Sequence, residues 1–194
     1  MPAKQGKPKR AYRKTAETQQ IIFDAAMKLM SEKGFQGTTV RDICGAAGIP
    51  IGTFYNCYKS KVDILKRIYD EGDAFIQTEE DACAGALAQL CAFARRYAVL
   101  NERTGIDVLR VLFYPSNSWF TIERPMQRYA RRFVEKGQTG GEIRRDKNAE
   151  EIVGGLFDIL RGVCYNWCVC NGDFDLHKRI DLHMELFCAS ISNR

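Results

Sequence analysis

Two short helical patterns joined by a tight corner constrain the fold of this chain more than any other feature. Thr39, with Asp42 three positions later, is a capping-box-like start for the first pattern, and Gly48 ends it. After the corner, a second short helix runs to about Tyr58 and turns Phe54 inward. Helices of about two turns that are joined through a glycine meet at a steep angle. The stretch 39–58 therefore predicts a helix-turn-helix.

The second helix of this pair carries side chains suited to DNA. A helix that displays its N-terminal residues fits the major groove, where Asn56 matches an adenine edge and Ile51 a thymine methyl group. A plain helical corner would explain Gly48 equally well. It would not explain an outward Tyr55 beside Asn56, followed by Lys59 and a second lysine. We therefore expect binding to double-stranded DNA.

A basic arm precedes the helical part of the chain. The net charge is +5, and residues 1–14 contain six Lys or Arg and no acidic residue, so the remaining 180 residues sum to −1. We expect residues 1–14 to be disordered and to be attracted to a polyanion by counterion release. A solubilising tail explains the arm equally well when it is considered by itself.

Helical spacing continues through the rest of the 194 residues, without a convincing alternating strand pattern. The sequence predicts an all-α protein of about nine helices. Its expected parts are the arm at 1–14, a three-helix DNA-binding domain at 15–62, and a helical effector-binding and dimerisation domain at 63–194. The glycines of 137–141 match no phosphate-loop spacing and are interpreted as chain breaks.

Composition excludes several classes of protein. Hydrophobic residues are 45% of the chain and charged residues 27%, as in a globular protein with a core. We find no long uncharged apolar run and no signal-peptide pattern, so we expect a cytoplasmic protein that does not span a membrane. In a reducing compartment, the eight cysteines are expected to be free thiols.

Residues 23–65 closely resemble the DNA-binding region of the tetracycline-repressor (TetR) family of bacterial transcription regulators. The matching residues keep a fixed spacing: Gly34-Phe35, Thr38-Thr39-Val40, Asp42-Ile43, Ala47-Gly48, Gly52-Thr53-Phe54-Tyr55 and Ser60-Lys61. A weaker similarity covers residues 155–176. The resemblance implies an all-helical homodimer that binds a palindromic operator, most often as a repressor, and releases it when a small effector binds the C-terminal domain.

The resemblance also implies roles for individual residues. Phosphate contacts are expected from the second helix and from the helix-turn-helix corner onward, and base contacts from positions that vary with the operator. Together with Lys59, whose side-chain chemistry alone suits a phosphate, the expected DNA-binding residues are Thr39, Arg41, Pro50, Ile51, Thr53, Tyr55, Asn56 and Lys61. Two positions depart from the family pattern: Cys57 replaces a common Tyr or His, and Pro50-Ile51 gives the reading helix an apolar start.

The C-terminal half is expected to contribute a dimer interface and an effector pocket. Apolar residues of the last two helices are the candidates for pairing: Ile152, Leu156, Leu160, Ile180, Leu186 and Phe187. Aromatic residues and a cysteine between 82 and 170 are the candidates for lining a mostly apolar pocket: Phe93, Tyr97, Phe113, Trp119, Phe157, Cys164 and Trp167. Either set would also be compatible with plain core packing.

The alternative function is a thiol-, redox- or metal-responsive regulator on the same scaffold. Cys164 and Cys168 are four residues apart and would share a helix face. The histidines His177 and His183 do not share a face, and the chain has no CxxC pair, so we expect no structural metal site. The sequence has no cofactor fingerprint and no nucleophile motif near a histidine, so we expect neither a cofactor nor an enzyme.

Overall fold

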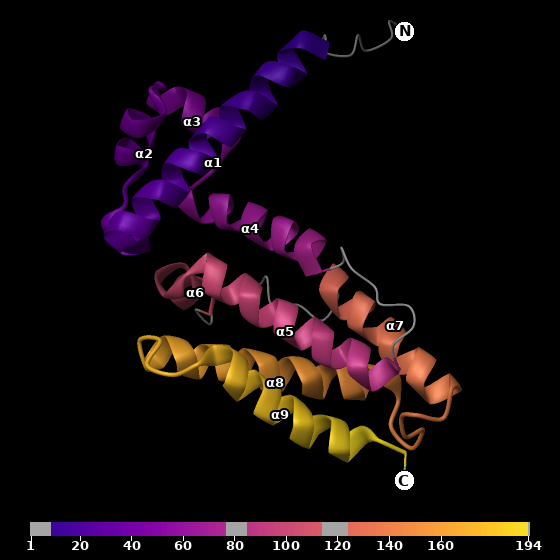
Figure 1. The fold of residues 1–194 in the computed structure, drawn as a ribbon. Helices are drawn as coiled ribbons and strands as arrows, with labels where there is room; N and C mark the ends of the chain where they lie inside the picture. Colours follow the sequence, from indigo (N-terminus) through magenta and orange to yellow (C-terminus); the bar gives the residue numbers. More distant parts are fainter. Residues whose placement is uncertain (1–8, 77–84, 114–123, 194) are drawn as a thin grey trace, which may run out of the picture. The chain divides into compact units, whose positions relative to one another are not determined.

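The computed structural model describes residues 9–76, 85–113 and 124–193 (Figure 1). Within these ranges the regular structure is helical apart from one isolated antiparallel bridge between Ile143 and Ser192, which confirms the all-α class. The chain divides into two compact units, residues 1–67 and 68–194. The boundary falls inside a helix, α4 (Lys61–Ile76), five residues later than the domain boundary expected from the sequence.

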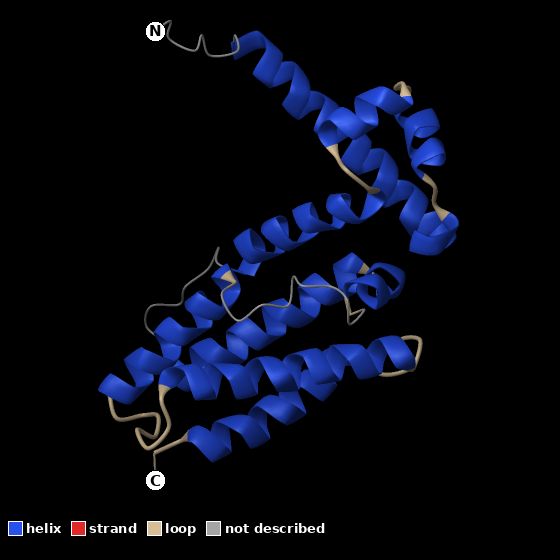
Figure 2. Ribbon diagram, turned by 180° about the vertical axis from the view of Figure 1, so that it is seen from behind, coloured by secondary structure: helices blue, strands red, loops and turns tan. Residues whose placement is uncertain are grey.

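The N-terminal unit contains α1 (Lys9–Gly37), α2 (Val40–Ala47), α3 (Ile51–Cys57) and the start of α4. In both ribbon views α2 and α3 lie on the same side of the later part of α1 (Figures 1 and 2). Residues 9–14, which were assigned to a disordered arm, belong to α1 in the structure. Ile22, Ala26 and Met30 recur every four residues on α1 and are fully buried.

The end of α1 is shaped by Gly34. This residue has φ 73° and ψ 166°, outside the helical region and accessible to glycine without strain. The resulting kink turns Phe35 back into the core, where 5% of its surface is exposed. The chain then enters the helix-turn-helix through Thr38, whose hydroxyl donates to the Gly34 carbonyl oxygen at 2.9 Å.

The C-terminal unit is a helical bundle that also receives the end of α4. Its helices are α5 (Ala86–Thr104), α6 (Ile106–Leu112), α7 (Pro125–Thr139), α8 (Ala149–Val169) and α9 (Leu176–Ile191). α5 packs on α7 and α9, and α8 packs on α6, α7 and α9. Aromatic rings of α5, α7 and α8 meet in the centre: Phe93 lies 5.7 Å from Phe157 and 6.4 Å from Tyr129 between ring centroids.

The apolar character of α8 has a structural explanation. Among the described helices, α8 is the one long and apolar enough to cross a membrane, with a mean hydropathy of 1.2 over its best window. However, 44% of that window is buried inside the protein. Its side chains Leu156, Phe157 and Leu160 are at most 1% exposed within the bundle core. These values fit a core helix of a globular domain, which passes the same length and hydropathy test.

Candidate DNA interface and effector cavity

The helix-turn-helix corner is fixed by local backbone chemistry. Thr39 and Asp42 form the reciprocal capping box predicted from the sequence. Gly48 ends α2 in the left-handed conformation, with φ 64°, and its N–H donates to the Cys44 and Gly45 carbonyl oxygens. Phe54 of α3 is fully buried behind the corner. The angle between α2 and α3 is therefore set by hydrogen bonds and packing within the protein.

The outward face of α3 combines apolar, aromatic and polar side chains. Ile51 is 46% exposed and Tyr55 55% exposed, so two large hydrophobic side chains face solvent on a helix of seven residues. Asn56 and Lys59 are exposed beside them. The expected DNA-binding residues fall into two groups in the structure. Seven are exposed, namely Thr39, Arg41, Pro50, Ile51, Tyr55, Asn56 and Lys59, whereas Thr53 and Lys61 are half-buried.

The Thr39 hydroxyl already has partners inside the protein. It donates to the Asp42 carboxylate at 2.8 Å and accepts the Asp42 N–H at 3.1 Å. The Thr39 N–H and hydroxyl together lower the pKa of Asp42, with the N–H having the larger effect. Sequence reasoning assigned Thr39 both to the cap and to a phosphate contact; in this structure its side chain is hydrogen-bonded as the cap.

Lys61 joins the end of α1 to the start of α4. Its ammonium donates to the Phe35 carbonyl oxygen at 2.7 Å and to the Thr38 carbonyl oxygen at 2.8 Å. The nitrogen also lies 4.3 Å from the centroid of the Phe35 ring, which is cation–π geometry. Burial lowers the pKa of Lys61. The sequence predicted a phosphate contact at this position. In the structure, the side chain instead binds backbone oxygens that are distant in the sequence and lie beside it only in the folded chain.

A small cavity lies in the C-terminal unit between α4, α5, α6 and the start of α7. Its volume is about 30 Å³, room for one or two water molecules. The wall is mostly apolar and includes Leu100, Leu109, Leu112, Phe113 and Met126. Its polar groups include Tyr97, Asn101 and Thr104 of α5 and Arg124, the N-cap residue of α7. Ligand pockets for drug-sized molecules hold roughly 300 Å³ or more. The cavity is therefore closed to such a ligand in this conformation.

The cavity agrees only partly with the predicted effector pocket. Tyr97 and Phe113 line it. Phe93, Phe157 and Cys164 are instead at most 1% exposed in the bundle core, where they pack against neighbouring helices. Trp167 is half-buried against the same core, and Trp119 lies outside the described residues. Leu100, Asn101 and Arg124 were missed because periodicity separates inward from outward faces and does not locate gaps between helices.

Arg124, which lines the cavity, forms a buried ion pair with Asp73. The Arg124 guanidinium lies 3.2 Å from the Asp73 carboxylate, and their side chains are only 11% and 8% exposed. The same guanidinium lies 4.3 Å from the centroid of the Tyr69 ring. Burial raises the pKa of Asp73, and the positive charge of Arg124 opposes this rise. The pair therefore places a buried cation at the edge of a mostly apolar cavity.

The structure corrects the predicted dimer residues. Ile152, Leu156, Leu160, Ile180 and Phe187 are at most 9% exposed because they form the core of the protomer itself. Leu186, by contrast, is 63% exposed. The outward surface of α8 and α9 also includes Tyr165, Val169 and Leu182, each more than half exposed, and the glycines 154 and 162. A shallow groove of about 210 Å³ runs between the two helices beside Gly162 and His183.

The cysteines highlighted by sequence spacing are poorly placed for reaction. Cys164 is fully buried, and burial raises its pKa well above the ordinary value. Cys168 is 3% exposed, and burial raises its pKa to about 11. Thiols react as thiolates, so both are inert near neutral pH. Within the described part of the chain, no group of three or more His, Cys, Asp or Glu side chains could hold a metal ion.

Comparison with known proteins identifies the family. Residues 22–68 match the sequence profile described as "Bacterial regulatory proteins, tetR family". The Transposon Tn10 TetC protein of Escherichia coli is 29% identical over 156 residues, which cover 77% of this chain and 76% of that protein. The chain belongs to the TetR family. The matched range of this TetR-family protein contains α2, α3, most of α1 and the first part of α4. Its N-terminal unit is therefore the DNA-binding domain of a transcription regulator.

Further matches agree with this assignment. The HTH-type transcriptional regulator AcrR of Shigella flexneri is 35% identical to this TetR-family chain over 60 residues, 31% of the chain and 28% of AcrR. Among solved structures, the transcriptional regulator FadR from Bacillus subtilis in complex with stearoyl-CoA has a TM-score of 0.70 at 20% identity. That likeness covers 89% of this chain and 98% of FadR and shows a shared fold.

Proposed function

We propose that this TetR-family regulator is a cytoplasmic homodimeric repressor that releases a palindromic operator when a small, largely apolar effector opens the cavity of the C-terminal unit. One observation carries this proposal. Ile68, Tyr69 and Gly72 of α4 form part of the cavity wall, and Lys61 at the start of α4 holds the end of α1. A ligand that widens the cavity therefore acts on the helix that also supports the DNA-binding unit.

The proposed DNA contacts follow the exposed surface of α2 and α3. Arg41, Tyr55 and Lys59 would bind phosphate oxygens and Asn56 a base edge, while Ile51 would contact a thymine methyl group. Thr53 and Pro50 border the same face. Lys61 and Thr39 are proposed to position this surface through their internal hydrogen bonds.

DNA binding is tested with a labelled fragment of the DNA upstream of the gene. Lys59→Ala should weaken binding to all sequences and lower the slope of log affinity against log salt by about one. Asn56→Ala should cost about 1–3 kcal/mol at one base position and reduce discrimination there. Glu32→Gln, on an exposed side chain of α1, is the matched control and should bind as wild type. Unchanged affinity and salt slope in Lys59→Ala would contradict the proposed interface.

The proposed effector has an apolar body and a polar or anionic end. Most of the cavity wall is apolar, and Arg124 lies at its edge, where an anionic group would have to share the guanidinium with Asp73. Acyl-CoA compounds are the first class to test, since the FadR structure of similar fold contains stearoyl-CoA. The closed volume of about 30 Å³ requires the helices around the cavity to separate before such a chain enters.

The effector is tested by adding stearoyl-CoA to the protein–DNA complex, with coenzyme A as the control. Stearoyl-CoA should release the DNA, and coenzyme A should not. Leu100→Trp, which fills the cavity from α5, should still bind DNA but lose this response. Ala88→Trp, at an exposed position of the same helix, should respond as wild type. If stearoyl-CoA released DNA from both variants at the same concentration, the effector would bind outside this cavity.

A further inference from the structure

Two cysteines that are far apart in the sequence face each other in the C-terminal unit. The Sγ atoms of Cys91 on α5 and Cys188 on α9 are 3.7 Å apart, although 97 residues separate them. Both side chains are half-buried at the contact between the two helices. A disulfide bond is about 2.05 Å long, so the sulfur atoms need to approach by about 1.7 Å. Rotation about the Cα–Cβ bond of either cysteine moves its sulfur by a distance of that order.

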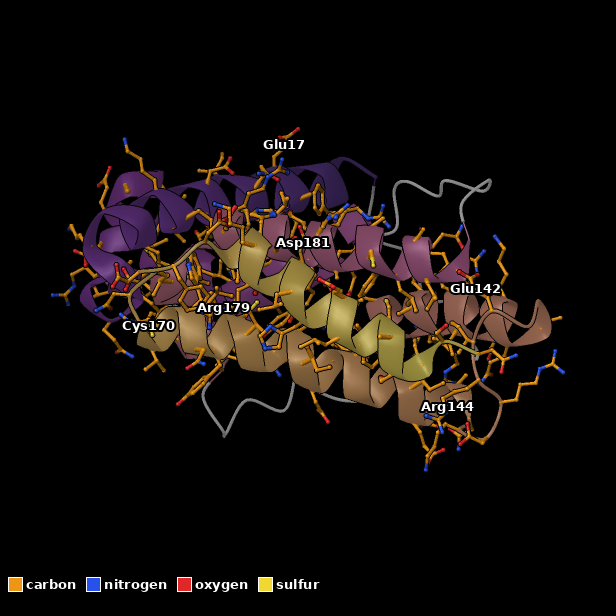
Figure 3. The ribbon with its side chains drawn as sticks, turned by 60° about the horizontal axis from the view of Figure 1, so that its bottom comes forward. Glu17, Glu142, Arg144, Cys170, Arg179 and Asp181 are labelled. Atoms are coloured by element: carbon orange, nitrogen blue, oxygen red, sulfur yellow. The ribbon has the colours of Figure 1, made fainter. Side chains whose placement is uncertain are left out.

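The surroundings of the pair favour a thiolate on Cys91. The hydrogen bond between the two thiols is the main reason that the pKa of Cys91 falls to about 7; the nearby Arg95 guanidinium adds to this, whereas burial and Asp181 oppose it. Arg95 is held by Asp181 at 2.8 Å, labelled on α9 in Figure 3. The same hydrogen bond, burial and the Glu142 carboxylate raise the pKa of Cys188.

Charged groups of opposite sign lie near the two thiols. Arg95 lies near Cys91, whereas Glu142 lies near Cys188 and accepts hydrogen bonds from the N–H groups of Ala86 and Leu87 at the start of α5. A nucleophile beside a neighbouring thiol is the arrangement that sensor cysteines use. Burial raises the pKa of Cys44 and Cys57 as well as that of the α8 pair, which leaves these four thiols less reactive, while Cys170 is an exposed thiol with no cysteine partner in the described part of the chain.

We propose that Cys91 and Cys188 form a reversible, peroxide-sensitive disulfide that links α5 to α9. The Cys91 thiolate attacks one oxygen of hydrogen peroxide, the O–O bond breaks, and a sulfenic acid and hydroxide form; hydroxide takes up a proton to become water. The Cys188 sulfur, losing its proton, then attacks the sulfenic sulfur, and the hydroxyl group leaves as water. In total, two thiols and one peroxide give one disulfide and two waters.

The disulfide would close a loop from residue 91 to residue 188. A link across a loop of this length restricts the unfolded chain and makes the C-terminal unit more resistant to unfolding. It would also fix α9, which carries the exposed Leu182 and Leu186, to α5. This inference concerns a site outside the effector cavity, and it does not depend on which effector the protein binds.

The disulfide is tested by exposing the native full-length protein to hydrogen peroxide, then alkylating the remaining thiols and mapping peptides by mass. In wild type, peptides containing Cys91 and Cys188 should be joined within one chain, lighter by two hydrogen atoms, and separable by dithiothreitol. The melting temperature of the oxidised protein should rise by several degrees. Cys170→Ser, which removes an exposed thiol, is the control and should behave as wild type.

Single variants separate the roles of the two thiols. Cys188→Ser should accumulate a sulfenic acid at residue 91 that a dimedone probe captures, whereas Cys91→Ser should yield little sulfenic acid at Cys188. Neither variant should show the rise in melting temperature. The proposal would be overturned if Cys91 and Cys188 both remained open to alkylation after peroxide treatment, or if peroxide joined them to cysteines other than each other.

Discussion

At the scale of single residues, the sequence around Lys61 suggests a contact with a DNA phosphate, whereas its side chain forms hydrogen bonds inside the protein. Its ammonium donates hydrogen bonds to the Phe35 and Thr38 carbonyl oxygens, whereas the nearby Lys59 side chain is exposed. Hydrogen bonds from a charged donor contribute more to stability than neutral ones. The two lysines should therefore respond differently to the same substitution.

Lys61→Met should lower the free energy of unfolding of the protein by about 1–2 kcal/mol, because two carbonyl oxygens at the end of α1 lose a charged donor. Urea unfolding, followed by circular dichroism, measures this loss. Lys59→Met is the matched control and should change stability by less than about 0.5 kcal/mol. Equal effects of the two substitutions would show that the α1–α4 link contributes nothing.

The capping box gives a pH-dependent prediction. The pKa of Asp42 is lowered in the folded protein, so its carboxylate adds stability above the unfolded pKa of about 3.9, and this stability is lost as pH falls through the lower folded value. Wild type should therefore be more stable than Asp42→Asn at pH 7. The difference should stay constant down to about pH 5 and shrink below about pH 4. Urea unfolding of both proteins across this range measures it, and a difference that grows on acidification would contradict the assignment.

Local sequence was enough to predict the helix-turn-helix corner but not the long-range contacts that hold the helices together. The roles of Thr39, Asp42 and Gly48 depend on neighbours within a few residues, and the structure confirms all three. Lys61 reaches a carbonyl oxygen 26 residues away, and Cys91 meets Cys188 across 97 residues. Contacts of that kind exist only once the helices have packed, so spacing along one helix could not reveal them.

At the scale of helices, periodicity identified the apolar faces but not what each face packs against. Residues such as Leu156 and Leu160 of α8 were assigned to a dimer interface and are instead the core of the protomer. A helix in a bundle needs one apolar face for its own protomer before it offers another to a partner. The apolar residues of α8 and α9 suit either the protomer core or a dimer interface, and sequence alone could not divide them between these two surfaces.

Two glycines on neighbouring helices provide a test of how closely the elements approach. A Cβ atom at Gly137 of α7 would lie 2.6 Å from a methyl carbon of Ile143 and 2.7 Å from the Cβ of Ala86. Gly137→Ala should therefore destabilise the protein by about 1–3 kcal/mol through overpacking. Thermal or urea unfolding measures this. Loss of less than about 0.5 kcal/mol would show that α7 and the start of α5 can separate easily.

Gly154→Ala is the matched control for Gly137→Ala. A Cβ atom at Gly154 meets nothing within 4 Å in the protomer, and the residue lies inside helix α8. Alanine should then raise helix stability by about 0.5–1 kcal/mol. If unfolding shows this gain while self-association weakens, Gly154 lies where a second copy of the chain approaches the helix closely.

At the scale of the whole molecule, the exposed apolar surface of α8 and α9 predicts self-association. Leu186→Glu places a charge where a leucine is 63% exposed, so the protomer fold should be kept while the proposed dimer is lost. Sedimentation velocity should show a monomer, and operator affinity should fall by at least tenfold because one reading helix covers only half a site. Ile21→Glu, at a residue 50% exposed on α1, is the control and should remain dimeric. A dimeric Leu186→Glu protein would direct attention to another surface.

The support of the helix-turn-helix has a consequence for the speed of recognition. The capping box, the left-handed Gly48 and the Lys61 contact fix α2 and α3 without any help from DNA. The protein then has little backbone to order during an encounter, and no slow folding step stands between collision and docking. Association should be limited by diffusion steered by charge, with rate constants approaching about 10⁸ M⁻¹ s⁻¹ at low ionic strength and falling steeply as salt is added.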